Sequence, residues 1–135
     1  IMNCFYTMEV PAGLSQLFTL PSTRAGAVGV THIDGKQVAA DAVLLPYLVV
    51  LPMGWNWSLH FCQGAVAKLT KEALRGADLV EDKQPGRVIN HLSPIVGAAY
   101  VDNFAVLGTD AAAVQHGLEA IVTRCKEVGL PVHEI

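Results

Sequence analysis

The sequence predicts an α+β fold with a largely antiparallel sheet, on three observations. Short apolar segments with strand character follow one another closely, so they can pair locally. Two long segments carry apolar residues three or four positions apart, the spacing of helices that cover one face of a sheet. Hydrophobic residues make up 52% of the 135 residues, which is enough for one core.

The first elements are short. Residues 4–10 are aromatic and apolar, and predict the end of a strand. Pro11 suits the first position of a short helix that reaches about Gln16. Residues 17–20 (LFTL) then predict a second strand.

A hairpin and an apolar strand follow. Asp34 and Gly35 predict a turn between residues 27–33 and 36–40, because Gly accepts the positive φ that such a turn requires. Residues 42–50 form a continuous apolar run, which is typical of a strand covered on both faces.

The segment from Trp55 to about Gly76 predicts a long helix. Its apolar stripe consists of Trp55, Leu59, Cys62, Val66, Leu69 and Ala73. Residues 78–93 are polar, contain a Pro-Gly pair and predict a loop.

Strands at 98–101 and 104–107 are expected around Asp102 and Asn103, which suit a tight turn. A second helix would begin at Thr109 or Asp110 as N-cap and end at Gly129. Its apolar stripe consists of Val114, Leu118, Ile121, Cys125 and Val128.

Charge and cysteine content exclude several classes of protein. Charged residues make up only 16%, against about 25% on average, which indicates surface normally covered by further domains. The net charge of −3 gives no basic surface for nucleic acid, which counts against a free-standing polynucleotide binder. Cys4, Cys62 and Cys125 form no CxxC pair and no even set, which favours reduced, mostly buried thiols in an intracellular protein. The longest apolar run, residues 42–53, is too short for a membrane span.

Asp102 is the sharpest candidate for chemistry. A carboxylate held between two apolar strands is a hard oxygen ligand at a fixed position, as Mg²⁺ sites in phosphoryl transfer require. Taken alone, however, Asp-Asn is a common turn dipeptide. The five histidines show no metal-ligand spacing with the cysteines.

Three motifs in order resemble those of retrotransposon-type reverse transcriptases, the RNA-directed DNA polymerases. Residues 100–103 (YVDN) resemble the Tyr-x-Asp-Asp signature between its apolar strands. Residues 50–55 (VLPMGW) resemble the Leu-Pro-Gln-Gly segment before a long helix. Residues 3–6 (NCFY) and 17–22 (LFTLPS) resemble the region after the first catalytic aspartate. The resemblance implies that residues 1–135 are a partial reverse-transcriptase domain, a palm with part of the fingers, truncated at both ends, whose antiparallel sheet packs on two main helices.

The resemblance also implies roles for individual residues. Asp102 and Asn103 would be the catalytic pair, with Asp102 binding the metals and Ile1 touching one metal through its carbonyl group. The nucleotide would be bound by Asn3 and Cys4 through backbone amides, by Phe5 beneath the sugar, and by Met53 and Gly54. The implied reaction is attack of a primer 3′-OH on a deoxynucleoside triphosphate along an RNA or DNA template, with two Mg²⁺ ions or Mn²⁺ in their place. The implied partners are template, primer, nucleotide and the missing fingers and thumb segments of the same polyprotein.

Four departures from the family pattern bear on activity. The first aspartate would fall one residue before Ile1, and the expected lysine beyond Ile135. Asn103 replaces the second aspartate of the signature, so it brings no negative charge to a metal. Met53 replaces a glutamine, and a thioether cannot donate a hydrogen bond. We therefore expect the isolated chain to be inactive.

Two alternatives stay open at the level of sequence. The first is a decayed or domesticated palm that acts as a non-catalytic interaction module, which the two substitutions and the acidic balance favour. The second is an unrelated α+β domain in which Asp102 and Asn103 are only a turn.

Overall fold

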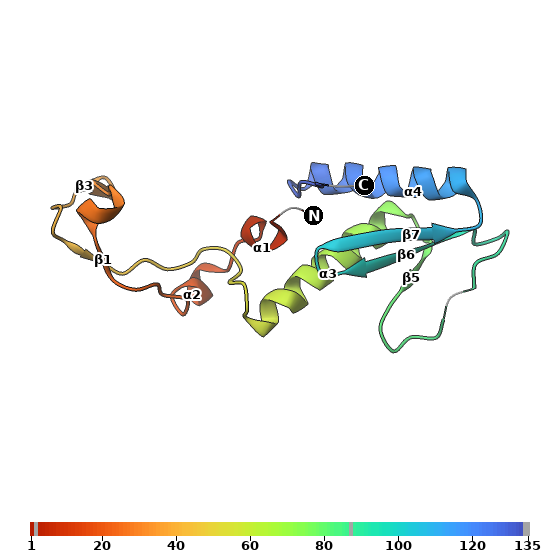
Figure 1. Ribbon diagram of the computed structural model, residues 1–135, viewed down its shortest axis with the longest axis horizontal. Coiled ribbons are helices and arrows are strands. Elements are labelled where there is room, and N and C mark those ends of the chain that lie inside the picture. Colours follow the sequence, from red (N-terminus) through yellow and green to blue (C-terminus); the bar gives the residue numbers. More distant parts are fainter. Residues whose placement is uncertain (2, 87, 134–135) are drawn as a thin grey trace. The chain divides into compact units, whose positions relative to one another are not determined.

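The chain folds into two compact units. The computed structural model describes residues 1, 3–86 and 88–133. Unit 1 consists of Ile1–Met8 and Met53–Ile135, and unit 2 consists of Glu9–Pro52 (Figure 1). Unit 2 therefore interrupts the sequence of unit 1. Four α-helices and several small sheets make up the described part of the chain, which confirms the α+β class.

The sheet of unit 1 has three strands, in the order β5–β6–β7. β6 (Ile95–Tyr100) and β7 (Asn103–Gly108) form the predicted antiparallel hairpin, each strand longer than expected. β5 (Asp78–Val80) lies parallel to β6, with Leu79 opposite Gly97. The prediction of a loop over residues 78–93 is thus wrong at β5, because a strand of three residues in a polar segment leaves no alternation to recognise.

Two long helices, α3 (Asn56–Ala73) and α4 (Ala111–Glu127), cover one face of this sheet. Gly97 of β6 lies so close to α3 that an added Cβ would be 3.1 Å from the Thr70 side chain. An added Cβ at Gly117 of α4 would likewise be 3.3 Å from the Val106 side chain of β7. The core between these elements consists of Leu69, Leu74, Val106, Ile121, Cys125 and Leu130.

The helix predictions are confirmed in extent and partly in orientation. Cys62, Val66 and Leu69 of α3 are buried as expected, but Leu59 is 49% exposed. Ser58 and Thr70 are fully buried instead, so the buried face of α3 is rotated from the apolar stripe. Apolar periodicity alone could not show this, because both residues are polar.

The ends of α4 follow the predicted capping. The Asp110 side chain accepts a hydrogen bond from the Ala112 amide at 2.9 Å, which makes Asp110 the N-cap. Gly129 has φ +77°, and the amide of Leu130 donates to the Cys125 carbonyl at 2.9 Å. A left-handed residue that closes the last turn in this way is a common helix stop.

The segment before unit 2 is a helical turn and not the predicted strand. α1 (Cys4–Thr7) begins after Asn3, whose φ of +54° is left-handed. The Thr7 hydroxyl donates to the Cys4 carbonyl at 2.9 Å and closes the turn. The aromatic residues of this segment favour strands only in their average propensity, and tertiary contacts override such propensity readily.

Unit 2 is built from short elements. The predicted short helix is α2 (Ala12–Ser15), with Pro11 as its N-cap and not its first residue. The Asp34-Gly35 hairpin is confirmed, but its strands β2 (His32–Ile33) and β3 (Lys36–Gln37) have two residues each. β1 (Thr23–Arg24) pairs with β4 (Val43–Leu44), and the 3₁₀ helix η1 (Ala25–Val28) occupies the start of the expected hairpin strand.

Residues 17–20 and 42–50 pair less regularly than expected. Thr19 and Tyr47 form an isolated bridge, and only β4 is a named strand in the second segment. Exposure alternates along residues 42–50, so the prediction of a strand covered on both faces is wrong. The exposed apolar side chains are those of Val43, Leu45, Tyr47 and Val49.

The chain enters and leaves unit 2 along paired backbone. Glu9 and Val50 form an antiparallel bridge, and the Val10 amide donates to the Val49 carbonyl at 2.9 Å.

Within the described residues, none of the helices combines the length and the apolar character needed to span a bilayer.

Candidate functional site

The hairpin turn that carries Asp102 is tight and unusual. Tyr100 pairs with Asn103, so the two turn residues are Val101 and Asp102 and not the predicted Asp102 and Asn103. Val101 has φ +54°. A branched residue in this left-handed region is disfavoured by about 1 kcal/mol or more, so neighbouring groups must hold the turn.

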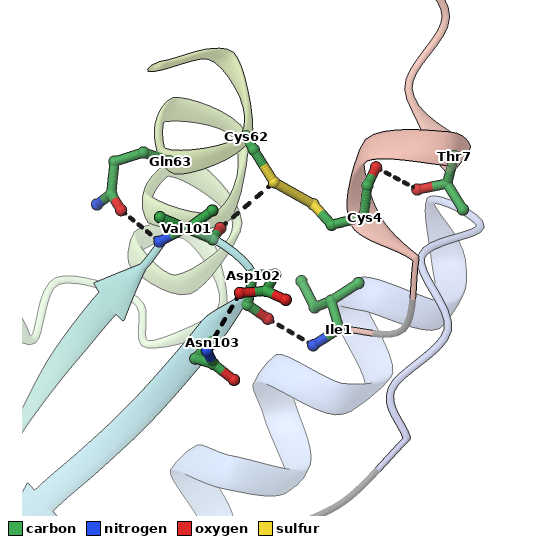
Figure 2. Close-up of a disulfide and its surroundings, with 8 residues drawn as sticks. All are labelled: Ile1, Cys4, Thr7, Cys62, Gln63, Val101, Asp102 and Asn103. Atoms are coloured by element: carbon green, nitrogen blue, oxygen red, sulfur yellow. Dashed lines mark hydrogen bonds between the residues drawn. A yellow bond between two sulfur atoms is a disulfide. The ribbon is translucent and has the colours of Figure 1, made fainter. Parts of the chain in front are cut away.

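Gln63 of α3 holds the turn from the side. Its Oε1 accepts a hydrogen bond from the Val101 amide at 2.6 Å, and its Nε2 donates to the Ala99 carbonyl at 3.0 Å. β5 pairs with β6 only as far as Ala98, so the edge of β6 is open beyond that residue. The amide group of Gln63 satisfies this edge as a neighbouring strand would (Figure 2).

A disulfide joins Cys4 of α1 to Cys62 of α3 beside the same turn (Figure 2). The prediction that these two thiols are reduced is wrong, since spacing along the sequence cannot show that two cysteines 58 positions apart meet in the fold. The prediction that the cysteines are buried is confirmed, with exposures of 1% for Cys4, 0% for Cys62 and 1% for Cys125. Cys125 is a free thiol, and burial raises its pKa, which keeps it protonated.

The first residues of the chain contact the turn directly. The amino group of Ile1 donates to the backbone carbonyl of Asp102 at 2.5 Å, across 101 positions of sequence. Figure 2 shows Ile1 pointing its nitrogen toward this carbonyl, with Asn103 on the other side of Asp102. A small core of Cys4, Cys62 and Val66 packs beneath, with Ile1, Phe5, Met8, Ala99, Val101 and Phe104 around it.

The side chains of Asp102 and Asn103 interact with each other. Asn103 Nδ2 donates to Asp102 Oδ1 at 3.1 Å, and Asp102 is partly exposed. The pair offers a metal one carboxylate and one amide oxygen, which is a partial ligand set for Mg²⁺. Elsewhere in residues 1, 3–86 and 88–133, no three side chains of His, Cys, Asp or Glu gather as a metal site would require.

Of the predicted nucleotide-binding residues, the structure brings Asn3, Cys4 and Phe5 to the turn. Asn3 is exposed and begins α1, Cys4 is buried in the disulfide, and Phe5 is partly buried against the small core. Phe5 is thus at least an ordinary core residue. Its role beneath a sugar stays a prediction.

Met53 and Gly54 lie apart from the turn. They precede the first residue of α3, whereas Cys62 and Gln63 are about two helical turns further on, roughly 10 Å along the axis. Met53 is 66% exposed. Gly54 has φ +94°, which gives a backbone reason for glycine at this position in addition to the nucleotide binding that the resemblance implies.

Sequence reasoning missed Gln63 and the role of Val101. The only signal for Gln63 was a polar residue next to the buried stripe of a predicted helix, which does not identify its partners 36 and 38 positions away. Nothing in the sequence indicates the positive φ of Val101, because valine is among the residues that adopt positive φ least readily.

Comparison with known proteins identifies no relatives: no family model matches the chain, and no curated protein or solved structure is significantly similar to it.

Proposed function

We propose that the chain is the palm, with part of the fingers, of a retrotransposon-type reverse transcriptase, and that the Asp102 turn is its catalytic edge. One observation carries the proposal. Ile1, which lies just before the 3–6 motif, and Asp102 of the 100–103 motif are 101 positions apart in sequence and are joined by a hydrogen bond. A turn dipeptide in an unrelated α+β domain has no reason to lie beside residues that match the other motif.

The position of the Ile1 nitrogen supports a second carboxylate close to Asp102, on a residue that would precede Ile1. In a chain that continues upstream, this nitrogen is the peptide link to the preceding residue, whose Cα is then about 2.4 Å from it. An aspartate there would have its side chain within a few ångström of Asp102, because the Ile1 nitrogen is 2.5 Å from the Asp102 carbonyl. Two adjacent carboxylates are the usual ligands of divalent ions in nucleotidyl transfer.

Asp102 of the turn, Gln63 of α3 and Phe5 of α1 would each have a distinct part in this site. Asp102 would bind the ions, and the hydrogen bonds of Gln63 to Ala99 and Val101 would fix its backbone. Phe5, on the adjoining segment, would exclude a ribose 2′-OH. When bound, the ions activate the primer 3′-OH and stabilise the leaving pyrophosphate.

The first prediction concerns metal binding at the turn. We take the chain with one aspartate added before Ile1 and titrate it with Mn²⁺, following paramagnetic broadening of the amide signals of residues 101–103. We expect Asp102→Asn to weaken Mn²⁺ binding about tenfold or more, because it removes a negative charge. We expect Asn103→Asp to strengthen binding several-fold for the opposite reason.

Asp110→Asn is the matched control, since it removes a carboxylate at the N-cap of α4 and asparagine caps a helix equally well. Equal losses in Asp102→Asn and Asp110→Asn would mean that Mn²⁺ senses only net charge, and would contradict the proposal. Primer extension gives a second measurement: we expect no incorporation by the 135-residue chain, and Mg²⁺-dependent incorporation by a protein that also contains the upstream aspartate and a thumb.

A specific contact favours a non-catalytic palm as the second candidate. Asn103 Nδ2 donates a hydrogen bond to one carboxylate oxygen of Asp102. An aspartate at position 103 would instead have offered a second carboxylate to a metal. If the longer protein binds Mn²⁺ no better as Asn103→Asp and does not extend primers, the turn is an inherited structure whose use is interaction and not catalysis.

A further inference from the structure

The sulfur atoms of Cys4 and Cys62 form a disulfide beside the turn, and the proposed nucleotide transfer uses neither sulfur. We propose that Cys4 and Cys62 are a thiol–disulfide switch that fastens the segment Ile1–Met8 to α3 when oxidised and releases it when reduced. The inference goes beyond the proposed function and does not depend on it.

The disulfide joins the two parts of unit 1 that are separated in sequence. Ile1–Met8 belongs to unit 1 but is separated from the rest of it, in sequence, by the whole of unit 2. Its described contacts are the helical turn α1 against α3, the hydrogen bond from Ile1 to Asp102, and the packing of Ile1, Cys4, Phe5 and Met8 on the two hydrophobic cores. The regular structure of this segment is the four-residue helix α1, so its local stability is lower than that of the long helices. One covalent bond to α3 therefore substantially raises the fraction of molecules in which the segment is docked.

Reduction also changes the contact between α3 and the turn. Cys62 Sγ lies 3.5 Å from the Val101 carbonyl oxygen. In the disulfide this sulfur carries no proton, so the contact is not a hydrogen bond. In the reduced state the thiol can donate to that carbonyl. The redox state of the pair therefore changes a contact at Val101, the residue before Asp102.

The chemistry balances with a dithiol as reductant. One thiolate of the dithiol attacks a sulfur of the pair and breaks the S–S bond, forming a mixed disulfide. Its second thiolate then displaces the remaining protein sulfur and closes an intramolecular disulfide. Two electrons pass to Cys4 and Cys62, which take up two protons and become thiols. Because both sulfurs are buried, exchange requires the Ile1–Met8 segment to open first.

Peptide mapping of the oxidised 135-residue chain tests the pairing. Trypsin cuts after Arg24, Lys36 and Lys68, so the disulfide joins peptide 1–24 to peptide 37–68, whereas Cys125 lies in the separate peptide 125–126. We expect this linked pair by mass spectrometry, one free thiol per chain in denaturant before reduction, and three after. Three free thiols after incubation with oxidised glutathione, or a link to Cys125, would overturn the proposal.

Thermal unfolding and hydrogen exchange test the fastening. We expect dithiothreitol to lower the Tm by about 10 °C, in line with loss of a disulfide that closes a long loop, and to accelerate amide exchange in residues 3–7 about tenfold or more. Cys4→Ala and Cys62→Ala should lose this redox dependence.

Cys125→Ala is the control. It removes a third buried cysteine outside the pair, so its own Tm falls but its response to dithiothreitol stays that of the unsubstituted chain. The same Tm and the same exchange rates with and without dithiothreitol would contradict the switch, even where the disulfide itself is found.

Discussion

At the scale of single residues, Gln63 decides the geometry of the candidate site. Two hydrogen bonds from one side chain reach the backbone on both sides of Tyr100, and the 2.6 Å bond holds Val101 at positive φ. An amide is the one uncharged side-chain group that offers a donor and an acceptor in the geometry of a peptide. No other side chain of similar length replaces it without loss.

We expect Gln63→Met to lower the free energy of unfolding by about 1–3 kcal/mol, because it leaves the Val101 amide and the Ala99 carbonyl without this partner. Chemical denaturation measures the change. The control is Gln115→Met, which removes an exposed hydrogen bond to Glu119 on α4 and should cost less than about 0.5 kcal/mol. Similar losses in both variants would show that Gln63 contributes only helix propensity.

At the scale of elements, close approach between the hairpin and α4 depends on glycine. A Cβ at Gly108 would lie 2.6 Å from the backbone carbonyl oxygen of Pro94 and 2.8 Å from Val114. The same carbonyl accepts a hydrogen bond from the Thr109 amide at 3.2 Å. Because a backbone atom cannot move aside as a side chain can, the end of β7 has no room for alanine.

We therefore expect Gly108→Ala to destabilise unit 1 by about 1–3 kcal/mol through overpacking. Gly64→Ala is the matched control, since Gly64 lies inside α3 with nothing within 4 Å of an added Cβ. Alanine should stabilise that helix by roughly 0.5–1 kcal/mol. Denaturation midpoints of the two variants should shift in opposite directions, and a shift of both in the same direction would refute the packing argument.

The elements could be predicted from the sequence to the extent that their signals are local. The α3, α4 and β6–β7 segments carry periodicity or turn chemistry in consecutive residues, and all three are confirmed. β5 and α1 were missed because each depends on a partner distant in sequence: β5 on β6, and α1 on α3. For the same reason Asp102 could be selected as a candidate, but the contacts from Ile1, Gln63 and Cys62 could not.

At the scale of the whole molecule, unit 2 is an insertion with its two ends adjacent. Since Glu9 pairs with Val50, Met8 and Met53 are separated by at most about 20 Å of chain path. An eight-residue Gly-Ser linker, with a reach of roughly 26 Å, can therefore replace Glu9–Pro52. We expect the shortened chain to keep the fold of unit 1, because the core of that unit lies between α3, α4 and the sheet.

Amide exchange is the measurement for this excision. The amides of β6 and β7 should stay protected in the shortened chain, and its unfolding should stay cooperative. The comparison is the same shortened chain with Gly108→Ala, in which weakened packing at the end of β7 should lower the protection of the β6 and β7 amides. Loss of protection throughout the sheet of the excised chain would mean that unit 2 is needed for unit 1 to fold.

The disulfide also has a mechanical consequence. It closes a covalent ring that spans 58 positions and contains all of unit 2. A load applied to the two ends of the oxidised chain passes from residue 4 to residue 62 through the sulfur bridge, so the ring carries no tension. After reduction the same load stretches the ring as well, and the fully extended chain becomes longer by roughly 200 Å.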